Sequence, residues 1–210
     1  MQPSHIDHLV FTAPSLEVGV NYVEAQLGVR PQPGGQHLLM GTHNALLRFG
    51  ERVYLEVIAI NPEMAQPNRP RWFNLDHVHP TPRLAGWIAS TDDIHAAQAT
   101  HPEIFGNVNP MSRGDINWLI TIPDDGSLPL AGIAPTLLQW LVDDHPASLL
   151  QDQGCRLIEL EGFHPHPKNI FTLLAAIDFQ AKLLINAIAE PEQPRLIARI
   201  KTPSGIRQLE

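Results

Sequence analysis

The predicted secondary structure of this chain repeats in order, and the repeat constrains the fold more than any single motif. Residues 5–13 (HIDHLVFTA) alternate as a strand, residues 14–28 have the spacing of a helix, and residues 34–60 carry three short strands. Ser15 suits the cap of the helix and Gly28 suits its end. We therefore expect a strand–helix–strand–strand–strand module over residues 1–60.

The same order returns after a proline-rich connector at residues 61–83. Residues 84–91 form a predicted strand, an aspartate opens a predicted helix over residues 92–101, and three more predicted strands lie within residues 107–144. The twenty prolines of the chain favour many short elements joined by turns. A second βαβββ module is thus expected over residues 84–146.

A partial third copy follows. Predicted strands at 155–164, 182–190 and 195–203 flank a helix at 167–177 that begins with proline. The expected class is therefore α+β, with two βαβββ modules and a C-terminal βαββ unit over residues 155–210 packed on the same domain. That unit would cover a sheet face or serve in dimerisation, and the chain is expected to be a monomer or homodimer.

The composition of the chain argues against some classes of binding partner. A chain of 210 residues with 43% hydrophobic and 17% charged residues can bury a substantial core. A net charge of −8 argues against nucleic acid or an anionic membrane, and no apolar run approaches the roughly 20 residues of a membrane span. The N-terminus lacks the pattern of a secretion signal, so we expect a cytoplasmic protein. Cys155 is the one cysteine, which excludes an internal disulfide and a thiolate-rich metal site.

The segment RVYLEVIAI at residues 52–60 places a carboxylate, Glu56, in an apolar strand. Tyr54 and Ile58 share its face by strand parity. A buried carboxylate is costly unless it is paired, protonated or bound to a metal. Arg48 or a strand-edge amide could neutralise it; in a desolvated cleft without metal its pKa would rise, which suits a general base.

Several phrases together resemble the vicinal oxygen chelate superfamily, and its glyoxalase-like domain branch in particular. They are IDHLVFTAPSLEVGVNYVEAQLGVRP, GGQHLLMGTHNALLRFG, YLEVIAINPE, RLAGWIASTDD, PTLLQWLVDDHPA and GCRLIELEGFHP. The resemblance covers almost the whole chain. It implies that each module curls its sheet into a half-barrel and that two modules face each other around a cleft holding a divalent metal.

The resemblance also implies the ligands, which come from the first and last strands of each module. The first module supplies His8 and Glu56. The second offers Gly86, or Trp87 if the register slips by one, and then Gln139, which binds Mg²⁺ or Mn²⁺ better than Zn²⁺. Trp140 should point away from the cleft if Gln139 points into it.

Other residues are expected at the cleft from their place on strands and loops. Asn44 and Arg48 share parity on one strand and would orient a polar or anionic substrate, and Arg113 would bind a carboxylate. His37 is a further substrate-binding candidate. His77 and His79, in the connector, would either overhang the cleft or be solvated.

These features favour an enzyme of the glyoxalase-like type, a lyase or isomerase that acts on a small oxygen-rich metabolite. In the mechanism that the resemblance implies, a metal (Zn, Mn, Fe, Ni or Mg) at His8, Glu56 and Gln139 would stabilise an enolate, and Glu56 would be ligand or base. The ligand set of the second module is incomplete, so an alternative function remains: a metal-free protein that binds or sequesters a small molecule.

Overall fold

The computed structural model describes residues 3–210, so the first two residues of the expected first module lie outside the described part. The first module contains five elements in the expected order: β1 (His5–Thr12), α1 (Leu16–Leu27), β2 (Gln32–His37), β3 (Thr42–Arg48) and β4 (Tyr54–Ile60). The second module repeats this order with its helix divided: β5 (Arg83–Ser90), α2 (Ile94–Gln98), α3 (Pro102–Phe105), β6 (Asn107–Arg113), β7 (Ile116–Ile122) and β8 (Thr136–Trp140). The predicted repeat is confirmed.

The C-terminal unit has one strand more than the expected βαββ pattern. It consists of β9 (Arg156–His164), α4 (Pro167–Ala176), β10 (Leu184–Ala187), β11 (Arg195–Thr202) and β12 (Gly205–Leu209). The extra strand β12 follows a tight turn and pairs antiparallel with β11. It is mostly exposed, so it lacks the apolar alternation by which a strand is recognised in a sequence.

The helices are short, and their ends follow the sequence signals. Ser15 Oγ accepts a hydrogen bond from Val18 N at the start of α1, and Gly28 ends that helix with a φ of 69°. Asp93 caps α2 by accepting from Ala96 N. Within residues 3–210, no helix is both long and apolar enough to cross a membrane.

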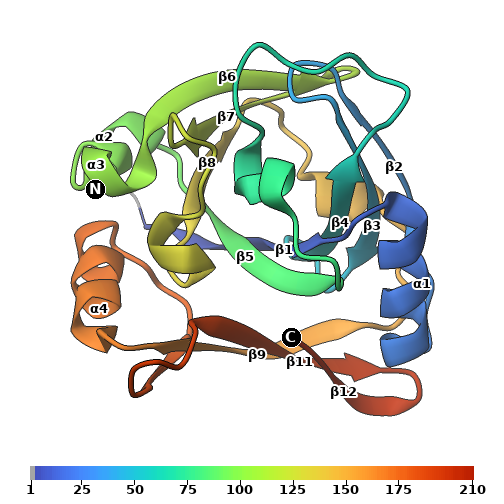
Figure 1. Cartoon of the computed structure of the whole chain (residues 1–210). Helices are drawn as coiled ribbons and strands as arrows, with labels where there is room; N and C mark the ends of the chain where they lie inside the picture. The colour runs from blue at the N-terminus through green and yellow to red at the C-terminus, as the bar shows by residue number, and fades with distance from the viewer. Residues whose placement is uncertain (1–2) are drawn as a thin grey trace.

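Two sheets make up the core. The larger has the strand order β2-β3-β4-β1-β5-β8-β7-β6, so each module contributes four neighbouring strands and β1 pairs antiparallel with β5 at their junction. The smaller has the order β10-β9-β11-β12. Figure 1 shows the larger sheet curled into a half-barrel and β9, β11 and β12 forming a layer beneath β1 and β5, with α1 and α4 on opposite sides.

The curled sheet separates two apolar clusters because successive side chains of a strand point to opposite faces. Leu9, Leu55 and Trp87 face outward and pack in one cluster with residues of α1, α4 and the smaller sheet. Val10 and Ile88 face inward, in a cluster that lines the concave side. The functional groups are therefore sought on the inward face.

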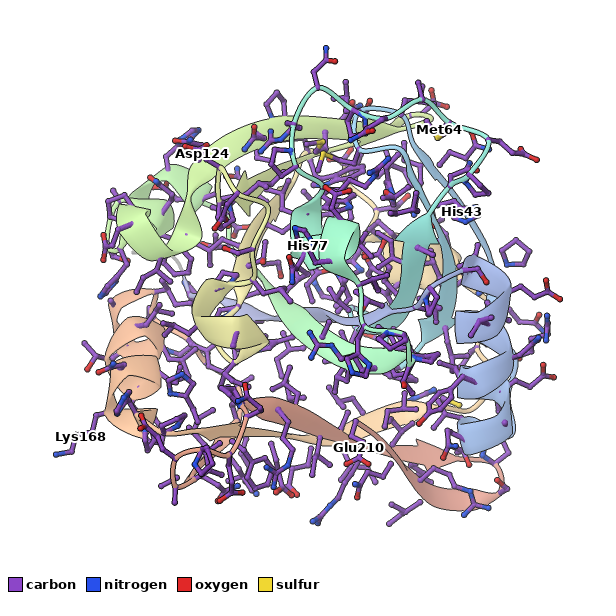
Figure 2. All side chains as sticks on the ribbon, in the orientation of Figure 1. His43, Met64, His77, Asp124, Lys168 and Glu210 are labelled. Carbon is purple, nitrogen blue, oxygen red and sulfur yellow. The ribbon has the colours of Figure 1, made fainter. Side chains whose placement is uncertain are left out.

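The connector between the modules enters the concave side of the curled sheet. It contains a short 3-10 helix, η1 (Trp72–His77), in which Phe73 and Asn74 have φ values of 56° and 55°. Trp72 and Phe73 are buried in the inward cluster. His77 lies on η1 near the middle of the view in Figure 2, whereas Met64 lies on the outer part of the connector.

The smaller sheet shares its core with the modules, which gives a stability prediction. Ile200 on β11 is fully buried in the outward cluster, so Ile200→Ala should lower the free energy of unfolding by about 2–5 kcal/mol. Urea denaturation should show one shifted transition. Ile206→Ala on β12 is the control, since that side chain is 65% exposed and its loss should change stability by less than about 0.5 kcal/mol. Two separate transitions, only one of them shifted, would instead mean that the C-terminal unit folds independently.

Candidate functional site

One small cavity lies on the concave side of the larger sheet, and we call it the site cavity. Five lining residues carry polar or charged groups: His8, His37, Tyr54, Glu56 and Arg113. The remaining lining residues are apolar or aromatic: Trp72, Phe73, Trp118, Ile120, Leu138 and Trp140. Its volume of about 20 Å³ leaves room for roughly one water molecule.

Glu56 is the central acidic group of the cavity. Its Oε1 accepts a hydrogen bond from Asn44 Nδ2 at 2.6 Å, and its Oε2 lies 3.6 Å from His8 Nε2. Burial by itself would raise the pKa of Glu56, but the neighbouring His8 and His37 and the Asn44 hydrogen bond lower it to about 2. Glu56 is thus an ionised carboxylate whose partners are a histidine and an amide rather than Arg48.

His8 is held from behind by Asp7. A bulge in β1, where the pairing with β5 shifts register between Ile6 and His8, makes Asp7 an extra residue in the strand. Adjacent strand residues ordinarily point to opposite faces, yet here the Asp7 carboxylate reaches the ring of His8, with Oδ1 2.6 Å from Nδ1. The second ring nitrogen of His8 is left facing Glu56.

Asp7 is fully buried and holds two further groups. Its Oδ2 accepts from Trp140 Nε1 at 2.8 Å and lies 3.0 Å from His145 Nε2. Burial would raise the pKa of Asp7, but the bonds from His145 and His8 hold it well below its usual range. For His8, burial would lower the pKa, and the two carboxylates Asp7 and Glu56 outweigh burial and raise it to about 9. At neutral pH a charged imidazole therefore lies between two carboxylates.

His37 faces Glu56 from the edge of the first module. Its Nδ1 lies 3.0 Å from Thr42 Oγ1, and its Nε2 lies 3.9 Å from Glu56 Oε1. Burial lowers its pKa to about 4, although the charge of Glu56 acts in the opposite direction. His37 is therefore neutral at pH 7, in contrast to His8.

Of the predicted site residues, the structure brings together His8, His37, Asn44, Glu56 and Arg113. Gln139 is not among them: its Oε1 accepts from Ile94 N at the start of α2, on the outward face. The expectation that Gln139 faces the cleft was wrong, because the apolar Leu138 and Trp140 occupy the inward positions of β8.

Arg48 also lies outside the cavity. Its guanidinium donates to the carbonyls of Gly50 and Leu150, so it fastens the segment after β8 to the end of β3. The expectation that Arg48 lies at the cleft was therefore wrong. His77 and His79 are exposed on the connector and do not line the cavity.

Three parts of the site were not predicted as such from the sequence: Asp7, Tyr54 and the aromatic wall formed by Trp72, Trp118 and Trp140. Tyr54 shares strand parity with Glu56 and could have been found by that rule; its ring stacks on His8 with centroids 4.4 Å apart. Asp7 could not be found by parity, because strict alternation places it on the opposite face from His8. Trp72 and Phe73 enter from the connector, whose path no periodicity indicates.

The donors were tested against the divalent metal that the family resemblance implies. Two ligands of one tetrahedral zinc ion lie about 3.3–3.6 Å apart when each bond is about 2.0–2.2 Å. The spacing of 3.6 Å from Glu56 to His8 is at the upper end of this range, the spacing of 3.9 Å to His37 exceeds it, and the two end on different oxygens of Glu56. Within residues 3–210, no group of three or more His, Cys, Asp or Glu side chains is arranged to hold a metal ion. The arrangement of these residues does not fit a metal.

Two βαβββ modules in one curled sheet, with a polar cavity on its concave side, define the vicinal oxygen chelate fold. The sequence profile of the glyoxalase-like domain matches residues 6–177. The chain therefore belongs to the glyoxalase-like domain family of that superfamily. No curated protein matches the chain at a significant level.

Three solved structures are similar to this chain to different extents. A hypothetical protein from Staphylococcus aureus aligns with 99% of this chain and 85% of its own, at 13% identity and a TM-score of 0.58. Methylmalonyl-CoA epimerase from Streptomyces coelicolor, in complex with 2-nitronate-propionyl-CoA, aligns with 70% of this chain and 100% of its own, at 18% identity and a TM-score of 0.45. A mutant of 4-hydroxymandelate synthase from the same organism aligns with 100% of this chain and 63% of its own, at 15% identity and a TM-score of 0.47. The likeness to the Staphylococcus aureus protein, at 13% identity, shows the fold alone.

The pKa of His37 gives a prediction for stability against pH. Because the folded-state pKa, about 4, lies below the ordinary 6.5, neutral His37 favours the folded state above pH 6.5, and this contribution is lost as pH falls toward 4. The loss should reach about 3 kcal/mol, as 1.36 kcal/mol corresponds to each pKa unit. His37→Gln should flatten the fall in unfolding free energy between pH 6.5 and 4, measured by urea denaturation. The exposed His5→Gln is the control, and a His37→Gln profile parallel to that of the wild type would contradict the assignment.

Proposed function

We propose that this chain is an enzyme, a lyase or isomerase, that moves a proton on a small oxygen-rich metabolite held in the site cavity. The observation that carries the proposal is the pair formed by Glu56 and His8. A carboxylate and an imidazole face each other at 3.6 Å in a buried cavity, and Asp7 holds the imidazole in place from the other side. A base and an acid that face one another across a water-poor space can act on the same substrate.

The two groups have opposite protonation states at neutral pH. Glu56, with a pKa lowered to about 2, is ionised and can accept a proton, whereas His8, with a pKa raised to about 9, can donate one. A substrate that enters between them separates Glu56 from the His8 charge. The pKa of Glu56 then rises toward its ordinary value, which makes the carboxylate a better base. His8 would meanwhile stabilise the negative charge that develops on a substrate oxygen.

The substrate needs more room than the closed cavity offers. Trp72 and Phe73 line the cavity from the connector, so displacement of η1 is the direct way to enlarge it. Closure of such a segment over a bound substrate would exclude water from the proton transfer. The connector therefore acts as a cover in this proposal.

A second candidate is a metal-free protein that binds or sequesters a small molecule. The enclosed aromatic wall of Trp72, Trp118 and Trp140 favours this candidate, since it could hold a ligand without any chemistry. Both candidates predict binding in the site cavity. Only the enzyme predicts proton exchange that depends on Glu56.

Exchange of carbon-bound hydrogen tests the proposal without knowledge of the full reaction. The protein is incubated in D₂O with a panel of small 2-hydroxy and 2-oxo compounds, and loss of the C–H signal is followed by proton NMR. Glu56→Gln should reduce the exchange rate at least about 100-fold, because a positioned base contributes 10²–10⁴-fold. Glu51→Gln, an exposed carboxylate on the same hairpin, should leave it unchanged.

Two further measurements decide between the alternatives. Ligand-induced change of tryptophan fluorescence without any hydrogen exchange would contradict the enzyme and support the binding protein. Metal content of protein purified without chelator should be well below one ion per chain. A full equivalent of metal, lost in Glu56→Gln, would overturn the metal-free account of His8 and Glu56.

A further inference from the structure

Arg113 brings a positive charge to the site cavity without an acidic partner. It ends β6, which lies at one edge of the larger sheet, and its half-buried side chain reaches across to β3 of the first module. There its Nη1 donates to Asn44 Oδ1 at 3.3 Å. In the part of the chain from residue 3 to 210, no carboxylate lies at ion-pair distance from this guanidinium. Most of its five N–H donors are available to a ligand.

Asn44 keeps Arg113 apart from Glu56. Its Nδ2 donates to Glu56 Oε1 at 2.6 Å while its Oδ1 accepts from Arg113, so a single amide group bridges the cation and the carboxylate. A direct ion pair between Arg113 and Glu56 would occupy both groups. The bridge leaves the guanidinium free for an anion and leaves Glu56 facing His8.

Two glycines in β2 make space for this arrangement. Gly35 N donates to Asn44 Oδ1 at 2.8 Å, and a Cβ on Gly35 would lie 2.7 Å from Arg113 Cδ. A Cβ on Gly34 would lie 2.0 Å from Asn44 Oδ1. Any larger residue at either position would displace the amide or the guanidinium.

The cavity wall holds a second unused donor. Trp72 is 97% buried and is one of the residues that line the cavity, and its Nε1 has no hydrogen-bond partner among the described residues. Leaving a buried N–H unpaired costs free energy that a ligand oxygen would recover. Together with Arg113, this donor favours a ligand whose oxygens accept hydrogen bonds and carry negative charge.

We propose that the substrate is a small carboxylate with an oxygen on the neighbouring carbon, a 2-hydroxy or 2-oxo acid, whose carboxylate binds Arg113. This inference rests on the proposed function and names its substrate class. Because one amide group spans the gap between Arg113 and Glu56, the carbon next to the bound carboxylate comes close to Glu56. In a 2-hydroxy acid that carbon carries a hydrogen, and Glu56 removes it as a proton. In a 2-oxo acid that carbon is a carbonyl, and Glu56 removes a proton from the carbon beyond it. The charge of His8 offsets repulsion between the two carboxylates.

A pair of ligands of equal size tests the inference. Lactate and lactamide differ in the charge of one group, and three of the four tryptophans line the cavity, so tryptophan fluorescence reports binding of either. The wild type should bind lactate at least tenfold more tightly than lactamide. Arg113→Gln should remove that preference by weakening lactate alone, whereas Arg207→Gln, an exposed arginine on β12, should preserve it.

A second variant tests position rather than charge. Gly35→Ala retains Arg113 but displaces its side chain, so it too should lose the preference for lactate. The melting temperature of each variant confirms folding.

Three outcomes would overturn the inference. One is equal affinity of the wild type for lactate and lactamide, and another is an unchanged preference in Arg113→Gln. The third is that none of lactate, glycolate and pyruvate binds. Loss of the lactate preference in Arg113→Gln, with no hydrogen exchange in any variant, would support the carboxylate site and reject the enzyme. Glu56-dependent exchange on neutral ketones without any preference for carboxylates would support the enzyme and reject the carboxylate site.

Discussion

The buried carboxylate of Asp7 is the interaction on which the rest of the site depends. It receives hydrogen bonds from His8, His145 and Trp140, which come from β1, from the segment after β8 and from β8 itself. One ionised group thus fixes the orientation of His8 and ties the second module to the first. Such a network is strongly stabilising only when all its members are satisfied, because each unpaired buried polar group is costly. The position of Asp7 follows from one bulge in β1.

The two modules contribute unlike halves to the cavity. The first supplies the polar groups on β1, β2, β3 and β4, whereas the second supplies mainly an apolar wall. Gly86, at the position of His8 in the second module, pairs with Val10, and a side chain there would meet Leu128 at 2.9 Å. Arg113 is the polar exception, and it reaches the first module from the far edge of the sheet. The site is asymmetric although the strand order is symmetric.

The sequence predicts more of the fold than of the candidate site. Strand alternation, Ser15, Gly28 and the prolines mark the elements locally, and their repeated order indicates two modules. The family resemblance implied that His8 and Glu56 face the cleft, and both line the cavity. Strand parity failed at Asp7 because a bulge depends on pairing with β5. It could not choose between Gln139 and Trp140 because parity does not say which face is inward. Arg48 has the correct parity, but it lies too near the strand end and binds the carbonyl of Leu150 instead.

The protonation state of His8 tests the central claim most directly, since both the proposed acid and the fit of the network require an imidazolium between Asp7 and Glu56. Nitrogen-15 NMR of histidine-labelled protein, with the His8 signals identified by their absence in His8→Gln, reports protons on each ring nitrogen. Our account predicts that both nitrogens of His8 are protonated at neutral pH and that the ring titrates with a pKa of about 9. A His8 ring that is neutral at pH 7.5 and titrates near the ordinary value of about 6.5 would contradict it.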